Sequence, residues 1–148
     1  MNDRILIIDL DSLRSEIFSY EDHRGWQYHW DVTLGRQLAE ARNDVRRFSL
    51  KEHGINIPFI HSQYTNLNEA YALTTDLGRP ILLIPIGDKV CLADGWHRLF
   101  RAAVEGVDIL PAYFLTEEEA STVLICTLPP GEGLDWGQPK TAASRPPR

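Results

Sequence analysis

Short apolar runs along the chain predict its strands. Residues 4–10 carry four consecutive aliphatic side chains, and residues 80–86 form an apolar run that one proline interrupts. Runs of this length are typical of buried strands. A tight turn at residues 87–89 and a second strand at 90–93 would complete a hairpin, and residues 109–115 predict a further strand.

Apolar residues at helical spacing predict the helices. The longest stripe predicts a helix over residues 33–50, capped by Thr33, and it consists of Leu34, Leu38, Ala41, Val45 and Phe48. The arginines of this helix are expected on its solvated face. Three shorter helices are predicted, over residues 66–77, 95–105 and 116–127. The last of them begins with a Thr-x-x-Glu capping box at Thr116.

The segment that precedes the long helix is aromatic. A short helix is predicted over residues 11–18. Residues 25–32 carry rings at alternate positions, namely Trp26, Tyr28 and Trp30. This alternation predicts an extended segment that presents its rings on one face. Residues 54–66 predict a loop that contains a short strand.

The alternation of helices and strands predicts an α+β fold in which helices flank a small mixed sheet. A chain of 148 residues has the size of one domain. We expect that domain to span residues 1–128. Residues 129–148 are rich in proline and glycine and poor in large apolar side chains, which predicts a flexible tail.

Composition narrows the class of protein further. The chain is 43% hydrophobic and 24% charged, and its formal net charge is −6. A chain this acidic is not expected to bind DNA or anionic membranes nonspecifically. No apolar run approaches the roughly 20 residues that a membrane-spanning helix needs. The N-terminus does not have the pattern of a secretory signal, and the chain has two cysteines, so we expect a cytoplasmic protein.

Residues 94–98, Asp-Gly-Trp-His-Arg, are the strongest candidate for chemistry because they join a predicted strand to a predicted helix. The first N–H groups of a helix have no internal partner, and its dipole favours anions there. Gly95 permits a positive φ or the close approach of a ligand. Arg98 and His97 supply cationic donors, and Asp94 is a candidate helix cap, base or Mg²⁺ ligand.

The residues around this segment resemble the ParB/sulfiredoxin superfamily. The resemblance rests on Val-Cys-Leu-Ala-Asp-Gly-Trp-His-Arg-Leu-Phe-Arg-Ala-Ala over residues 90–103, followed by Gly106 and by Ile-Leu-Pro-Ala-Tyr over residues 109–113. Upstream, a predicted helix and a Gly-x-Pro-Ile motif at Gly78 also fit the pattern. Together these features cover about residues 67–115. The resemblance implies a ParB/sulfiredoxin-like fold and a nucleotide ligand.

The branches of this superfamily differ at the 94–98 segment. Sulfiredoxins carry a nucleophilic cysteine where Trp96 stands, and Cys91 lies inside a strand, so sulfinic-acid reduction is not expected. Partition proteins carry Gly-Glu-Arg-Arg and bind CTP, and they continue into a DNA-binding domain that we do not expect here. The Asp-Gly-x-His-Arg form is most similar to small-molecule kinases and ATPases of the superfamily, although Trp96 departs from the more common His.

The resemblance implies a set of roles at this site. Gly95, Trp96, His97 and Arg98 would bind the phosphates of ATP, ADP or CTP. Asp94 and Glu16 would be the catalytic carboxylates, and Asp94 would also hold Mg²⁺. The implied reaction is nucleotide hydrolysis or phosphoryl transfer, which requires clamped phosphates and an oriented nucleophile.

Two other functions stay open at this stage. The first is a module without catalysis that binds a protein or nucleic-acid partner through the aromatic segment of Trp26, Tyr28 and Trp30. The second is a nuclease that depends on a divalent metal, and the negative net charge counts against it. Titration of the wild type and of Arg98→Ala with ATP, ADP and CTP separates the nucleotide-binding hypothesis from these two.

Two weaker motifs also carry candidate chemistry. Asp9 and Asp11 follow the first predicted strand, as in haloacid-dehalogenase phosphatases, but Leu13 stands where that family has Thr or Val. A strand end and a helix cap explain these acids better. A second group, Asp22, His23, His29 and Asp31, contains ligand types that bind metals. Its spacing matches no closed zinc site.

Overall fold

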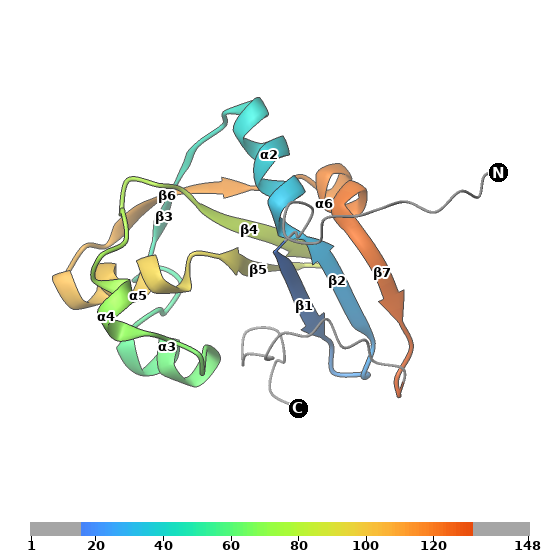
Figure 1. The fold of residues 1–148 in the computed structure, drawn as a ribbon, viewed down its shortest axis with the longest axis horizontal. Helices are drawn as coiled ribbons and strands as arrows, with labels where there is room; N and C mark the ends of the chain where they lie inside the picture. Colours follow the sequence, from blue (N-terminus) through green and yellow to red (C-terminus); the bar gives the residue numbers. More distant parts are fainter. Residues whose placement is uncertain (1–15, 132–148) are drawn as a thin grey trace, which may run out of the picture.

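The structure, a computed structural model described here for residues 16–131, contains two sheets that lie against each other (Figure 1). The four-stranded sheet has the order β3 (Arg46–Ser49), β6 (Ile109–Phe114), β4 (Ile81–Ile86), β5 (Lys89–Asp94). The three-stranded sheet has the order β1 (Ile17–Glu21), β2 (Gln27–Asp31), β7 (Leu124–Leu128).

The four-stranded sheet is the mixed sheet that the sequence predicts. Strands β4 and β6 run parallel, whereas the β3–β6 and β4–β5 pairs are antiparallel. The α+β prediction is therefore confirmed. The three-stranded sheet is antiparallel throughout. Its middle strand, β2, confirms the extended segment predicted over residues 25–32. The sheet itself is not predicted, because the sequence indicates helices at the end of residues 11–18 and over residues 116–127.

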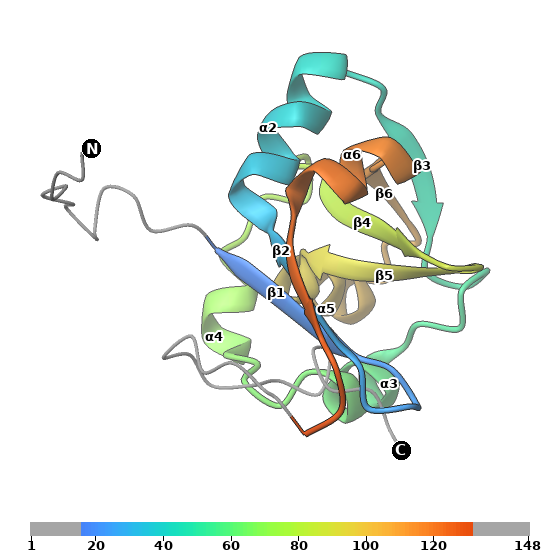
Figure 2. The ribbon, with the colours of Figure 1, turned by 90° about the vertical axis from the view of Figure 1, so that its right-hand side faces the viewer.

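The described residues form five helices that lie in two groups (Figure 2). Helices α3, α4 and α5 cover one face of the four-stranded sheet, and α2 and α6 contact each other beside the three-stranded sheet. Their bounds are α2 Val32–Arg42, α3 Ile57–Gln63, α4 Glu69–Ala72, α5 Trp96–Glu105 and α6 Glu117–Val123.

Strand β4 separates two hydrophobic cores. Ile81 and Leu83 pack with α5 and its neighbours, whereas Leu82 and Ile84 pack with the three-stranded sheet, α2 and α6. All four side chains are buried. A strand that is covered on both faces carries a continuous apolar run in place of an alternating one, which explains why residues 80–86 are the most regular signal in the sequence.

The helix predicted over residues 33–50 is wrong in its second half. It ends at Arg42, because Asn43 adopts the left-handed conformation of a helix C-cap with φ 58°. Residues 46–49 then form β3. The predicted apolar stripe is also misplaced, since Leu34 is exposed and the buried residues are Val32, Gly35, Arg36 and Ala39. The cap is Asp31, and Thr33 accepts a hydrogen bond from the Glu16 amide.

Other segments differ from their predictions in length or type. Phe18 lies in β1 and not in a helix, and residues 57–63 form α3 where a loop with a strand is predicted. The helix predicted over residues 66–77 is reduced to α4, and the last helix ends at Val123 so that β7 follows. The 81–94 hairpin, α5 and β6 are confirmed. The strand predicted at residues 4–10 and residues 132–148 of the predicted tail lie outside the described residues.

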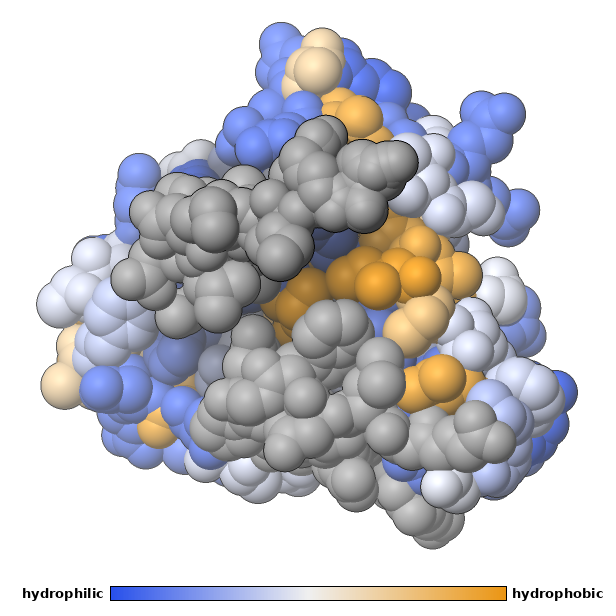
Figure 3. Space-filling view, turned by 45° about the vertical axis from the view of Figure 1, so that its right-hand side comes forward, coloured by the Kyte–Doolittle hydropathy of each residue, from blue (hydrophilic) through white to orange (hydrophobic). Residues whose placement is uncertain are grey.

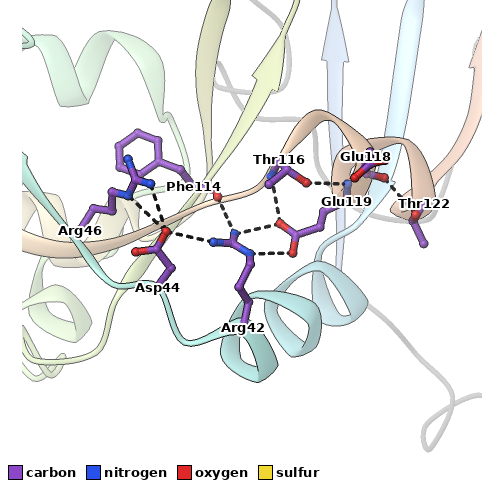
Figure 4. Close-up of polar contacts among 8 residues, drawn as sticks. All are labelled: Arg42, Asp44, Arg46, Phe114, Thr116, Glu118, Glu119 and Thr122. Atoms are coloured by element: carbon purple, nitrogen blue, oxygen red, sulfur yellow. Dashed lines mark hydrogen bonds and ion pairs between the residues drawn. The ribbon is translucent and has the colours of Figure 1, made fainter.

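The start of α6 is anchored by a polar network that also fixes the end of α2 (Figure 4). The predicted capping box is confirmed: Thr116 accepts from the Glu119 amide at 3.0 Å, and the Glu119 carboxylate accepts from the Thr116 amide at 2.9 Å. Arg42 donates to both oxygens of Glu119 at 2.9 Å and to the Phe114 carbonyl at 2.8 Å. The guanidinium of Arg42 holds the pKa of Glu119 below its usual value.

The surface carries both hydrophilic and hydrophobic residues. On the face shown in Figure 3, hydrophilic residues form the margin and a small hydrophobic area lies near the centre. Among the described residues, the helices are too short or too polar to cross a lipid bilayer.

We predict that Glu119→Gln lowers the free energy of unfolding by about 1 kcal/mol at pH 7, because the variant keeps the shape of the cap but loses the ion pair with Arg42. The folded-state pKa of Glu119 is depressed, so the contribution is present above its unfolded pKa and is lost as the pH falls through the lower folded value. Urea denaturation at pH 7 and below pH 4 measures the loss of stability in the variant and its dependence on pH. Glu118→Gln, on the exposed first turn, is the control, and an equal difference at the two pH values would contradict the ion-pair account.

Candidate functional site

The 94–98 segment forms the predicted corner between a strand and a helix. Strand β5 ends at Asp94, Gly95 is the N-cap residue, and α5 begins at Trp96. Gly95 has φ +131°, and a Cβ at this position would lie 2.5 Å from Cγ2 of Ile81. A glycine is therefore required by the local backbone and by the close packing of β4.

The N-terminus of α5 has no side-chain cap within the described part of the chain. The other helices are each capped by a side chain, from Asp31, Asn56, Asn68 and Thr116. The suggestion that Asp94 caps α5 is wrong, because its carboxylate binds arginines instead. The first-turn N–H groups of α5 consequently lack the internal acceptor that the other helices have.

Asp94 lies between two arginines. Arg36 of α2 donates to Oδ2 of Asp94 from Nη2 at 2.7 Å and from Nε at 3.2 Å. Nη2 of Arg98 lies 3.3 Å from Oδ1. The Arg36 side chain is only 9% exposed, so the expectation that it belongs to a solvated face is wrong. Charge spacing on the helix alone does not reveal a carboxylate 58 positions away that pairs with it.

Arg98 has a structural role in addition to its place at the site. Its Nη1 donates to the carbonyls of Arg79 and Pro80 at 2.7 and 2.6 Å, immediately before β4. Burial lowers the pKa of Arg98, and the Asp94 carboxylate opposes that shift. The guanidinium of Arg98 already contacts two carbonyls and one carboxylate. Its main role is therefore to position the residues of the site, and few of its N–H groups remain for a ligand.

His97 is held in one tautomer by the backbone. Its Nε2 accepts a hydrogen bond from the Asn68 amide at 3.1 Å, so in the neutral ring Nδ1 carries the proton. Burial lowers the pKa of His97, which favours the neutral form. The ring stands edge-on to Tyr64 and Tyr71, with centroids 5.5 and 5.0 Å away. His97 is therefore a neutral donor through Nδ1.

Trp96 forms an aromatic wall with Tyr64. The two rings are nearly parallel, with an interplanar angle of 7° and centroids 5.8 Å apart. The Nε1 atom of Trp96 is buried and has no hydrogen-bond partner in the part of the chain that the structure describes. The indole also packs against the core around α5. Trp96 thus shapes the site by stacking and packing.

A cavity of about 740 Å³ brings these residues together with Glu16 and Arg79, and we call it the central cavity. The Glu16 backbone is fixed to the start of α2, since its amide donates to Thr33 Oγ1 at 2.9 Å and its carbonyl accepts from the Val32 amide at 2.8 Å. Desolvation by the surrounding protein, and then the negative charge of Asp94, raise the pKa of Glu16. The two carboxylates that the resemblance implies therefore lie at one site.

The central cavity also contains residues that the sequence analysis did not single out. Arg79 occupies the variable position of the Gly-x-Pro-Ile motif, and its guanidinium makes no hydrogen bond with the described residues. Ser19 of β1 lines the same cavity. The position of Arg79 within the motif is a signal that identifies it, whereas nothing in the sequence distinguishes Ser19 from the aromatic residues around it.

The described residues do not fit a Mg²⁺ ion held by Asp94. Both carboxylate oxygens of Asp94 already face guanidinium groups, which carry the same sign of charge as the metal. Between residues 16 and 131 there is also no group of three metal-ligating side chains. Mg²⁺ usually requires one or two available carboxylates in addition to phosphate oxygens and water.

In the two remaining candidate groups, Asp22, Asp31 and Trp30 have structural roles. Asp22 binds Arg24 and the hydroxyl of Tyr28, and Asp31 caps α2, so the aspartates do not converge with the histidines on a metal. Trp30 is buried and stacks on Phe18, so it is not available to a partner in this conformation. Asp9 and Asp11 lie outside the described residues.

Cys91 is a half-buried thiol on the face of β5 that meets the three-stranded sheet. Burial raises its pKa to about 11. The nucleophilic form of cysteine is the thiolate, which such a shift suppresses at neutral pH. Cys91 therefore packs as an apolar residue of the strand.

We predict that Gly95→Ala destabilises the protein by about 3 kcal/mol or more, because the new Cβ would combine an unfavourable φ with overlap on Ile81. Thermal and urea unfolding measure the loss. Gly87→Ala is the matched control: its φ is +63°, but its new Cβ would have no neighbouring atom within 4 Å, so about 1 kcal/mol is expected. Equal losses in both variants would show that contact with Ile81 is unimportant.

Comparisons of the chain with protein-family models, with curated protein sequences and with solved structures find no match. The resemblance of residues 67–115 to the ParB/sulfiredoxin superfamily therefore rests on its sequence motifs. The geometry of the central cavity stands independently of that resemblance.

Proposed function

We propose that the protein binds a nucleoside di- or triphosphate, ATP, ADP or CTP, in the central cavity and hydrolyses it or transfers a phosphoryl group. The observation that carries this proposal is the uncapped N-terminus of α5, which opens together with Arg79 on a cavity that also holds two carboxylates. The resemblance to ParB/sulfiredoxin-like kinases and ATPases supports the same ligand.

The phosphates are assigned to the N-terminus of α5 and to Arg79. Uncapped helix N–H groups and the positive end of the helix dipole attract phosphate oxygens. Arg79 adds a guanidinium that matches phosphate in a bidentate way. His97 supplies a neutral N–H through Nδ1, and Arg98 holds the backbone before β4 in place. Arg79 is accordingly the residue on which binding depends most.

The aromatic side of the cavity suits the nucleoside. Tyr64, Tyr71 and Trp96 line the cavity beside His97. Flat rings at the edge of a phosphate site can stack on a nucleobase and accept different bases. The volume of about 740 Å³ lies in the range of small-molecule sites.

Glu16 is the proposed general base, and Asp94 positions the arginines. Asp94 is paired with Arg36 and Arg98. Burial and the charge of Asp94 raise the pKa of Glu16, and the nearby arginines oppose that shift. A raised pKa brings a carboxylate closer to the pH at which a base works well. Glu16 would orient a water molecule or an acceptor hydroxyl for attack on the terminal phosphorus. No step is assigned to Mg²⁺, and binding is best measured with and without it.

The two alternatives gain less support from the described residues. A partner-binding module would need exposed rings on the aromatic segment. Trp30 is buried, and Trp26 and Tyr28 are half-buried, so little ring surface is available to a partner. A metal-dependent nuclease would need ligands that Asp94, held by two guanidiniums, does not provide.

We predict that Arg79→Ala weakens nucleotide binding by at least about tenfold, the loss typical of a hydrogen bond to a charged group. Isothermal titration calorimetry with ATP, ADP and CTP, each with and without Mg²⁺, measures the affinities. Arg47→Ala, on the exposed edge of β3, removes the same charge away from the cavity and should leave them unchanged. A well-folded wild-type protein that binds none of the three nucleotides would overturn the proposed function.

We predict that Glu16→Gln lowers the rate of nucleotide turnover by about 100-fold or more while nucleotide affinity is retained, because general bases contribute factors of this size. In the wild type the rate should fall as the pH is lowered through the raised pKa of Glu16, since only the carboxylate accepts a proton. Phosphate release over a pH series measures both effects. Glu69→Gln, an exposed acid on α4, is the control. Unchanged turnover in Glu16→Gln would remove Glu16 from the mechanism.

A further inference from the structure

A hydrogen-bonded chain of three side chains crosses the first two strands. Ser19 of β1 and His29 of β2 lie directly opposite each other in the antiparallel register. Oγ of Ser19 lies 2.7 Å from Nδ1 of His29, and Nε2 of His29 lies 3.3 Å from Oε1 of Gln27. His29 is fully buried, and Ser19 lines the central cavity.

The acceptor that faces Nε2 of His29 favours one direction for these hydrogen bonds. A Gln Oε1 atom has no hydrogen and can only accept, which favours the tautomer in which Nε2 of His29 carries the proton and donates it. Nδ1 of the neutral ring then has a lone pair and accepts the hydroxyl hydrogen of Ser19. This is the arrangement of a nucleophile, a base and a residue that orients the base.

The position of Ser19 separates this chain from an ordinary polar pair inside a sheet. Ser19 shares the central cavity with Glu16, Arg79 and the N-terminus of α5. The guanidinium and the helix end favour an anionic electrophile in the cavity. Neither the resemblance nor the proposed roles of Glu16 and Asp94 involve Ser19.

We propose that Ser19 is a nucleophile, activated by His29, that attacks the phosphorus atom of a phosphoryl compound bound in the central cavity. The identification of a phosphoryl compound as the electrophile rests on the proposed function, whereas the identification of Ser19 as the nucleophile does not. In the step, Oγ of Ser19 forms a bond to phosphorus and its proton passes to Nδ1 of His29. The bond between phosphorus and the leaving group breaks, and the leaving group departs with the electron pair. The product is a covalent phosphoserine.

A fluorophosphonate probe tests this inference on the full chain without a nucleotide. The probe carries an electrophilic phosphorus atom, and fluoride is its leaving group. Peptide mass spectrometry after timed labelling identifies which serine reacts. Exposed Ser62, whose hydroxyl binds the Phe59 carbonyl, provides the background rate in the same sample. We expect Ser19 to be labelled at least about 100 times faster than Ser62, the factor typical of a general base.

Variants separate activation from simple exposure. Ser19→Ala should abolish the dominant label, and His29→Gln should slow labelling by about 100-fold. If His29→Gln does not fold, half-buried Gln27 decides the question: Gln27→Glu keeps an acceptor for Nε2 and should speed labelling, whereas Gln27→Leu removes it and should slow labelling. A purely structural pair predicts no opposite effects of these two variants.

The outcomes distinguish this inference from the proposed function. Wild-type Ser19 labelled no faster than Ser62, or labelled at the same rate in both Gln27 variants, would overturn the inference. Fast labelling of Ser19 that ATP suppresses would support the inference and place the nucleotide at the same cavity. Fast labelling that ATP, ADP and CTP leave unchanged would support the nucleophile and count against the proposed nucleotide site.

Discussion

The arrangement of the site depends on the ion pairs of Asp94 with Arg36 and Arg98. They join α2, β5 and α5, and Arg98 extends the contact to the carbonyls of Arg79 and Pro80 before β4. Buried charges are costly unless they are paired, so these groups constrain one another. Burial and the nearby negative charge of Asp94 raise the pKa of Glu16.

Rigid packing behind the site supports this polar network. Strand β4 is buried on both faces, and Ile81 lies so close to Gly95 that no larger residue fits there. The corner between β5 and α5 therefore has little freedom to move. A helix N-terminus fixed in this way presents its N–H groups without a rearrangement, which lowers the entropic cost of binding an anion.

The central cavity combines groups of both charges. Arg79 and the end of α5 carry positive charge, Glu16 is a carboxylate, and the rings of Tyr64 and Trp96 provide an apolar side. Phosphoryl transfer requires such a division between charge stabilisation and orientation of the nucleophile. The Ser19–His29 pair adds a hydroxyl whose proton already has an acceptor. The proposed function and the proposed nucleophile thus use different walls of one cavity.

The sequence alone determined the structural features that depend only on residues close together in the chain. The apolar run of residues 80–86, the Thr116 capping box and the glycine at position 95 each specify a local structure, and all three are found. Helical periodicity failed at residues 43–50, where Asn43 stops α2 and pairing with β6 stabilises a strand. Strand pairing between distant segments has no local signature, so β7 was missed in the same way.

Only the tertiary structure decided which partners the charged side chains bind. The motif at residues 94–98 was visible, but the partners of Asp94 and Arg98 come from α2 and from the backbone before β4. Ion pairing depends on distance in space and not along the chain, so the charge pattern of the helix does not identify Arg36 as a buried partner of Asp94. The meeting of Glu16 with the 94–98 segment is likewise a product of the fold, because only the packing of β1 and α2 beside β5 places them on one cavity.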